Sequence, residues 1–229
     1  MCRVTTEALV GLNDSHITWL SKTVGVHQNM AKHFIKMQNA AAKDGVELSI
    51  ASGFRSFDRQ MSIWTRKLTG VLPVKDHENN NVDLTTLTDI DKVKAILRYS
   101  ALPGTSRHHW GTDIDVYSPS QLSNDKSLQL EYWEYAKGGP FEKLTHWLTQ
   151  NAYKYNFFFP YQKFQGGVAA EPWHLSYAPL ANEHHQALMS GILMPILAKS
   201  NMPLYDEIAR NISMIFSKYV NNISEFTNG

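Results

Sequence analysis

Hydrophobic and polar positions along the chain predict helices and short strands in mixed order. Apolar residues recur at helical spacing from His16 to about Ala42, and Gly45 suits the left-handed conformation that ends a helix. The segment 46–51 alternates apolar and polar residues and predicts a strand. A turn at 52–56 then leads into a helix that reaches about Leu68, with Ser56 or Asp58 as its N-cap.

The middle of the chain predicts a loop, a helix and a strand. Residues 69–88 are polar and are interrupted by Gly70 and Pro73, which is typical of a loop or insertion. Residues 89–99 have helical periodicity, and 113–117 alternate as a strand. In that strand Ile114 and Val116 are expected to face the core, which places Asp113 and Asp115 together on the opposite face.

The last third predicts further helices and the final core strand. Residues 141–155 form a helix, 171–177 lead into a strand, and 181 to about 219 are helical with interruptions near Pro195 and Pro203. This order favours an α+β fold, with a small antiparallel sheet flanked by helices. We expect a domain over 1–180, with its motif-bearing core at about 46–177, and a helical C-terminal extension over 181–229 packed on the same domain.

Composition and charge exclude several function classes. The 229 residues carry 22 basic and 21 acidic side chains, so no strong field favours nucleic acid or an anionic membrane surface. No run approaches the roughly 18 apolar residues that a membrane span needs. The single cysteine, Cys2, allows no internal disulfide. The sequence opens without a basic-then-apolar leader, which favours the cytoplasm; removal of a leader would instead leave a periplasmic or cell-envelope protein.

Two short segments carry the most specific chemistry. The first, 106–115, contains His108 and Asp115 with Gly111 between them, and the second, 171–174, contains Glu171 and His174. Together they supply two imidazoles, one carboxylate ligand and a spare carboxylate, which is the donor set of a catalytic zinc site with a general base. Alone, the first segment is also compatible with a solvated loop and an edge strand, and a lone histidine in an aromatic strand is commonly a core residue.

Three segments in order resemble a known family. Ser52-Gly-Phe-Arg-Ser56, the spacing Ser106-x-His-x-x-Gly-x-x-x-Asp115, and Glu171-x-Trp-His174 are similar to the zinc D-alanyl-D-alanine carboxypeptidases of the VanY type. These enzymes share a fold with lysostaphin-type peptidases and the Hedgehog signalling domain. The resemblance covers about 46–177. It implies one zinc ion held by His108, Asp115 and His174, Glu171 as the catalytic base, and peptidoglycan stem peptides as substrate.

Other residues are candidate substrate contacts. Arg55 offers a planar fork for a terminal carboxylate or, alternatively, for the oxyanion of the transition state. Gln60 and Ser106 are secondary contacts, and Trp173 is a wall of the pocket, with core packing as its alternative. The residue two before the aspartate ligand is usually small in the family. Asp113 stands there, as a substrate contact or a solvent-facing residue, or thirdly as a partner of the metal ligands.

Three functions remain open at this stage. The first is a D-Ala-D-Ala carboxypeptidase that releases the terminal D-alanine through metal-activated water. The second has the same mechanism but cleaves another bond, as an LD-carboxypeptidase or a murein endopeptidase. The third is a non-catalytic binding domain of the same fold, against which the presence of Glu171 argues. His109 is expected to point away or to contact substrate, and His16, His27, His33, His77, His146, His184 and His185 are expected to be solvated. The oligomeric state is undetermined.

Overall fold

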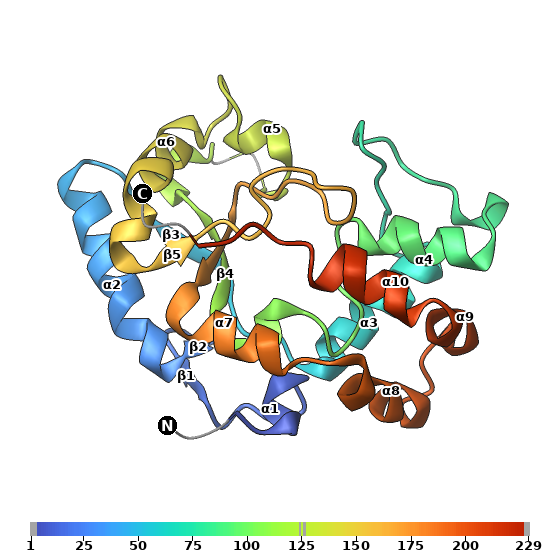
Figure 1. The fold of residues 1–229 in the computed structure, drawn as a ribbon. Coiled ribbons are helices and arrows are strands. Elements are labelled where there is room, and N and C mark those ends of the chain that lie inside the picture. Colours follow the sequence, from blue (N-terminus) through green and yellow to red (C-terminus); the bar gives the residue numbers. More distant parts are fainter. Residues whose placement is uncertain (1–3, 124, 126, 227–229) are drawn as a thin grey trace.

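An antiparallel sheet of four strands lies at the centre of the computed structural model, which describes residues 4–123, 125 and 127–226 (Figure 1). Its order is β3–β4–β6–β5, with β3 (Ser49–Ser52), β4 (Asp113–Tyr117), β6 (His174–Tyr177) and β5 (Phe157–Phe158). A separate hairpin is formed by β1 (Ile17–Trp19) and β2 (Gly25–His27). The α+β prediction is therefore confirmed, and the single cysteine, Cys2, lies outside the described residues.

The register of the central strands places two predicted metal-site residues side by side. Asp115 of β4 is directly opposite His174 of β6, and on its other side Asp115 pairs with Ser52 of β3. The pairing of β3 is irregular at this point, because its register shifts between Ile50 and Ser52. Directly opposed residues on antiparallel strands have their Cβ atoms about 5 Å apart, so both side chains can reach one ion.

Helices surround the sheet on two sides (Figure 1). Their bounds are α1 (Thr6–Leu9), α2 (Gln28–Lys43), α3 (Phe57–Leu68), α4 (Asp89–Leu97), α5 (Tyr132–Tyr135), α6 (Glu142–Asn151), α7 (Ala178–Ala187), α8 (Ser190–Lys199), α9 (Tyr205–Arg210) and α10 (Ile212–Ile215). Helix α3 begins as predicted, because the Ser56 hydroxyl accepts a hydrogen bond from the Arg59 amide at 3.2 Å. Helix α2 ends at the predicted left-handed glycine, Gly45, whose φ is 69°.

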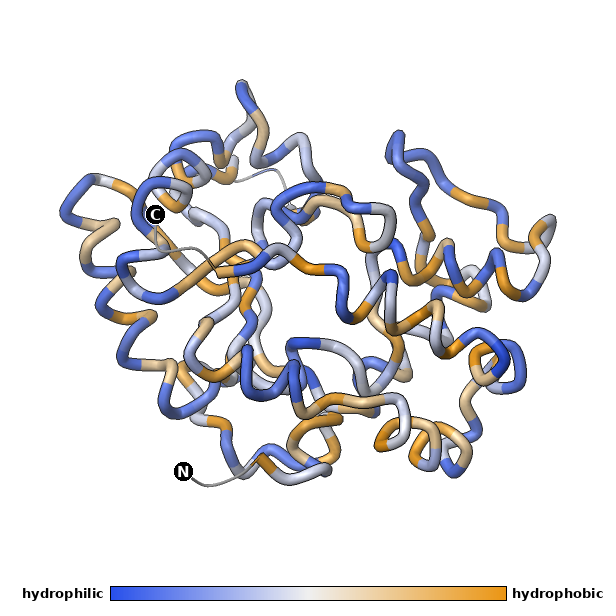
Figure 2. The backbone as a smooth tube through the Cα atoms, in the orientation of Figure 1, coloured by the Kyte–Doolittle hydropathy of each residue, from blue (hydrophilic) through white to orange (hydrophobic). Residues whose placement is uncertain are grey.

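Two hydrophobic cores hold the molecule together. One joins the sheet to α2 and α6 through residues such as Phe34, Ile114 and Leu144. The other joins α3 and α4 to the C-terminal helices α8, α9 and α10, with Trp64 and Leu193 among its members. Along α2 hydrophobic and hydrophilic stretches alternate turn by turn, as expected of a helix with one buried face (Figure 2). The C-terminal helices therefore share a hydrophobic core with α3 and α4.

The prediction of one helix from His16 to Ala42 was wrong for its first part. Residues 17–27 form the β1–β2 hairpin, and α2 starts only at Gln28. The turn is closed by the Leu20 amide, which donates to the Val24 carbonyl at 2.9 Å, and by the Ser21 hydroxyl, which accepts from the Val24 amide at 3.2 Å. The apolar residues of this segment fit both periods, and the polar turn between them favours the hairpin.

The predicted loop over 69–88 reaches toward the segment that precedes α5. It contains a short 3₁₀ helix, Leu84–Thr86, and an isolated bridge between Lys75 and Asn81. At its tip the Asn79 side-chain amide donates to the Glu131 carboxylate at 3.0 Å. The loop is thus tied to another part of the fold. Among the described residues, no helix combines the length and hydropathy that a membrane crossing requires.

Candidate metal centre and substrate cleft

The three residues predicted to bind metal converge on one point. Each of His108, Asp115 and His174 offers one ligand atom, and these atoms lie within 4.8 Å of one another. His108 comes from a short 3₁₀ helix, η2 (Arg107–Trp110), while Asp115 and His174 come from adjacent strands. Gly111 ends η2 with a φ of 65°, and a Cβ there would lie 2.4 Å from Ile17 Cδ1. A glycine is therefore needed for the turn that joins the two ligand segments.

The hydrogen bonds of both histidines leave one nitrogen of each free to coordinate. His108 Nδ1 donates to the Gly53 carbonyl at 2.9 Å, so Nε2 carries the lone pair and lies 3.4 Å from Asp115 Oδ2. His174 Nε2 donates to Asp113 Oδ1 at 3.1 Å, so Nδ1 carries the lone pair and lies 3.3 Å from Asp115 Oδ1. Orienting partners of this kind are typical of metal-binding histidines.

The charges of this cluster fit a bound cation. Asp115 Oδ1 is buried and has no hydrogen-bond partner among the described residues, which is costly for a carboxylate oxygen unless an ion takes the place. Burial lowers the pKa of the His174 imidazole, but the neighbouring carboxylates of Asp113, Asp115 and Glu171 together raise that pKa well above its usual range. Two imidazoles and one carboxylate are ligands that zinc accepts. The donor set therefore fits a zinc ion.

Asp113 is not the substrate contact or solvent-facing residue that the sequence suggested. Its side chain is fully buried and accepts hydrogen bonds from Arg107 Nε at 2.7 Å, Thr112 Oγ1 at 2.8 Å and Ser176 Oγ at 3.1 Å. Burial opposes its ionisation, but Arg107 and His174 outweigh burial and lower the pKa of Asp113. The third alternative holds instead: Asp113 orients the metal-site histidine His174.

Glu171 lies beside the proposed ligands without belonging to the group of three. A turn in which the His174 amide donates to the Glu171 carbonyl at 3.1 Å brings the two side chains together. Glu171 Oε2 is 3.3 Å from His174 Nδ1, and the residue is 8% exposed. Its amide donates to the Tyr161 carbonyl at 2.9 Å. The carboxylate is therefore held next to His174 Nδ1, the candidate ligand nitrogen, and still faces the cleft that Glu171 lines.

Arg55 lines the same cleft, but Gln60 does not have the predicted role of a substrate contact. Gln60 is fully buried; its side-chain oxygen accepts from Arg55 Nη1 at 3.0 Å and its amide donates to the Ala101 carbonyl at 2.7 Å. Arg55 Nη2 donates to Ser52 Oγ at 3.3 Å. Both polar atoms of the Gln60 side chain are therefore engaged within the protein, and the residue is too buried to reach a ligand. It positions the arginine.

His109 points away from the candidate metal centre and hydrogen-bonds to the backbone of the same arginine. Its Nδ1 donates to the Arg55 carbonyl at 2.6 Å, and its Nε2 accepts from the Gly104 amide at 3.0 Å. Burial lowers the pKa of His109 to about 3, so the ring is neutral and can make both bonds. Of the two expectations for this residue, pointing away is confirmed. His108 therefore belongs to the candidate metal centre, whereas the next residue, His109, holds the Arg55 loop.

A cleft of about 910 Å³ opens over these residues. Ser106 and Trp173 both line it as predicted, although Trp173 is 5% exposed and packs against Tyr135 in the core, with ring centroids 5.5 Å apart. Lys67 and Tyr161 are among the cleft residues that sequence reasoning missed. The Tyr161 ring lies 5.1 Å from that of His174, and burial raises the pKa of its hydroxyl to about 12. A polar residue on the cleft face of a predicted helix was the available signal for Lys67.

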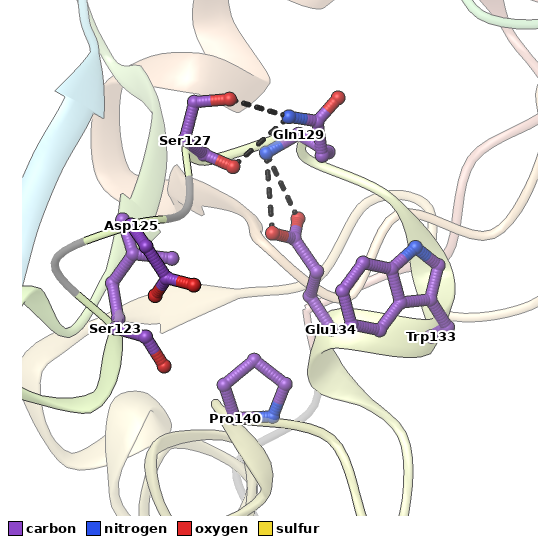
Figure 3. A pocket seen from close by; sticks show the side chains of 8 residues that line it. Ser123, Asp125, Ser127, Gln129, Trp133, Glu134 and Pro140 are labelled. Carbon is purple, nitrogen blue, oxygen red and sulfur yellow. Dashed lines mark hydrogen bonds between the residues drawn. The ribbon is translucent and has the colours of Figure 1, made fainter.

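A second cavity, of about 380 Å³, lies beside α5 (Figure 3). Several of its polar groups are used within the protein: the Glu134 carboxylate accepts from the Gln129 amide at 3.1 Å, and Gln129 Nε2 donates to Ser127 Oγ at 2.7 Å. Glu134 is 1% exposed. These bonds order the segment that leads into α5, so this cavity has a structural explanation and the cleft remains the candidate functional site.

Behind the metal centre, two histidines expected to be solvated are buried. His27 is 7% and His184 is 4% exposed, and their ring centroids are 5.9 Å apart, with His16 at 5.6 Å from His27. His27 Nδ1 accepts from the Asn29 amide at 3.1 Å and so caps α2. Burial, with further contributions from His16 and His184, lowers the pKa of His27 to about 4. The imidazoles pack as neutral rings.

The buried His27 predicts a loss of stability in mild acid. Because its folded pKa lies below the ordinary value of 6.5, its contribution is complete above that pH and falls as pH decreases toward about 4. The unfolded state takes up the proton first, which costs about 1.4 kcal/mol per pH unit for this group. His27→Asn keeps a capping acceptor. Its free energy of unfolding, measured in urea, should therefore depend less steeply on pH between about pH 7 and pH 5. An unchanged slope would contradict this assignment.

Comparisons with known proteins agree with the geometry. The model of the VanY family, D-alanyl-D-alanine carboxypeptidase, matches residues 23–180. An uncharacterized protein of Haemophilus influenzae is 39% identical over 121 residues, which are 52% of this chain and 92% of that protein. The chain is also similar to the structure of the LdcB LD-carboxypeptidase, with a TM-score of 0.52, 26% identity and coverage of 76% and 75% of the two chains.

A further solved structure shares the fold. It is a mutant of the vancomycin-resistance D,D-pentapeptidase VanY from a VanB-type cassette in complex with Zn(II), with a TM-score of 0.51, 23% identity and coverage of 79% of this chain and 92% of that chain. The family match spans more than half of the sequence and includes both segments of the metal centre. The resemblance seen in the motifs is confirmed: the chain belongs to the VanY family of D-alanyl-D-alanine carboxypeptidases.

Proposed function

We propose that this protein is a zinc carboxypeptidase that releases the terminal D-alanine from peptidoglycan stem peptides ending in D-Ala-D-Ala. One observation carries the proposal: His108, Asp115 and His174 converge at the cleft with Glu171 beside them. The family match and the peptidoglycan-related enzymes of the same fold support the substrate class. A binding domain has no need of Glu171 in this position, so catalysis is favoured over binding alone.

In the proposed mechanism the protein orients water and substrate around the metal centre. A zinc ion, which His108, Asp115 and His174 would hold, would supply Lewis acidity for the scissile carbonyl and for the attacking water, whose pKa it would bring to about 7. Glu171 takes the proton of the attacking water and passes it to the leaving amine. Asp113 and the Gly53 carbonyl keep His174 and His108 in the tautomers that the site needs. Arg55, held by Gln60 and Ser52, faces the reacting groups.

The products of three substrates test this function. The zinc-loaded protein is incubated with stem pentapeptide, stem tetrapeptide and intact murein, with a chelator control, and products are read by mass spectrometry. We expect metal-dependent loss of one D-alanine from the pentapeptide. Loss from the tetrapeptide instead would indicate an LD-carboxypeptidase, and internal cuts would indicate an endopeptidase. If no metal-dependent product forms from any of the three, the proposed function is wrong.

A further inference from the structure

Lys67 is a positively charged residue of the cleft that has no role in the candidate metal centre described above. It lies on α3, is half-buried and lines the cleft. Within the described part of the chain its ammonium group has no hydrogen-bond or ion-pair partner. Other cations of the cleft are engaged: Arg107 pairs with Asp113 at 2.7 Å, and the Arg98 guanidinium lies 5.3 Å from the centroid of the Phe164 ring. Lys67 is therefore available to an anionic group that enters the cleft.

Lys67 lines the cleft together with Arg55, Glu171 and the three candidate metal ligands. Burial lowers the pKa of its ammonium to about 8; the negative charge of Glu171 opposes this shift and the positive charge of Arg55 adds to it. The charges of the proposed base and of the cleft arginine therefore both influence the pKa of Lys67. At neutral pH it remains mostly protonated. A partly desolvated ammonium without a counter-ion is unfavourable, and an incoming carboxylate would remove that penalty.

Arg55 and Lys67 differ in how their side chains are held. Both residues line the cleft together with Glu171. Arg55 is also fixed by Gln60 and Ser52, while Lys67 is tethered only through its own flexible stem. Lys67 is therefore the less constrained of these two cleft cations.

We propose that Lys67 binds the C-terminal carboxylate of the substrate and so makes the enzyme specific for a free chain end, while Arg55 serves the oxyanion. This inference rests on the proposed peptidase function and divides between two residues the two roles that a single arginine could otherwise serve. It predicts that the free carboxylate contributes to binding mainly through Lys67, with a smaller effect on the chemical step.

Two matched peptides test the contact. One ends in D-Ala-D-Ala with a free carboxylate, and the other is the same peptide with a C-terminal amide. Lys67→Met should raise KM for the acid by roughly 10- to 100-fold, with a smaller change in kcat, and should leave KM for the amide nearly unchanged. Lys67→Arg should restore most of the preference for the acid. Lys36→Met, on the exposed face of α2, is the control for loss of a lysine charge.

Some outcomes would overturn the role of Lys67. A Lys67→Met enzyme that keeps the wild-type preference for acid over amide would do so, as would an equal fall in kcat for both peptides. Binding of the two peptides to zinc-loaded Glu171→Gln protein, measured by calorimetry, tests the contact without turnover. If wild type forms no product, the proposed function fails; if Lys67→Met still abolishes selective binding of the acid in that experiment, the carboxylate site stands independently.

Discussion

Replacing Glu171 by glutamine is expected to lower kcat by roughly 100- to 10,000-fold while zinc binding is retained, since general-base catalysis contributes that much. The amide has the shape of the carboxylate but cannot take a proton from water. Glu171 Oε2 lies 3.3 Å from His174 Nδ1, yet Glu171 is not one of the three residues whose ligand atoms form the metal group. The variant should therefore lose the base and keep the site.

Activity and metal content have to be measured on the same samples. Release of D-alanine from stem pentapeptide gives kcat, and elemental analysis after dialysis gives the zinc content per chain. Glu183→Gln, an exposed position on α7, is the matched control and should behave as wild type. Wild-type-like turnover in Glu171→Gln would refute the mechanism. Loss of zinc together with activity would instead show that Glu171 is a ligand.

Arg107→Met should destabilise the protein by about 3–5 kcal/mol, the usual cost of removing one partner of a buried ion pair. Arg107 is 4% exposed and Asp113 is fully buried, with 2.7 Å between Nε and Oδ1. A second guanidinium nitrogen donates to Ser176 Oγ at 2.7 Å. Without the arginine, Asp113 would keep its charge away from water or take up a proton, and either change has a cost.

Thermal unfolding of metal-free protein measures this cost without a contribution from zinc binding. We expect Tm to fall by roughly 6–20 °C, given the size of the chain. The double variant Arg107→Met with Asp113→Asn removes the orphaned charge and should recover part of the loss. A single variant within about 1 kcal/mol of wild type would contradict the importance of this pair.

Strand β4 and helix α3 could be predicted because their local signals agree with their tertiary surroundings. Alternation defines Asp113–Tyr117, and a serine cap defines the start of the helix at Phe57. The helix predicted from His16 failed because the apolar residues of 17–27 fit two periods. The pairing of β1 with β2 is a local hairpin contact, whereas the packing of Trp110 against His184 is decided by residues distant in sequence.

The candidate site shows the same division. Its motifs predicted that His108, Asp115 and His174 converge, and the structure brings their ligand atoms together; their role as zinc ligands stays a prediction. Asp113 was misjudged because alternation tells which residues share a face, but not whether that face meets solvent or a buried arginine. Gln60 was misjudged for a related reason: a polar residue near a site can satisfy a neighbouring side chain rather than a substrate.

The adjacent histidines of η2 have a consequence for how this enzyme can diversify. Because His108 belongs to the candidate metal centre and His109 donates to the Arg55 carbonyl, a residue inserted or deleted between 104 and 111 would displace the proposed ligand and the arginine relative to each other. The surface loop over 70–83 has no such coupling to either residue, and loops of this kind tolerate insertions. Changes in chain length that alter substrate range are therefore expected in that loop, while the histidine segment keeps a constant length.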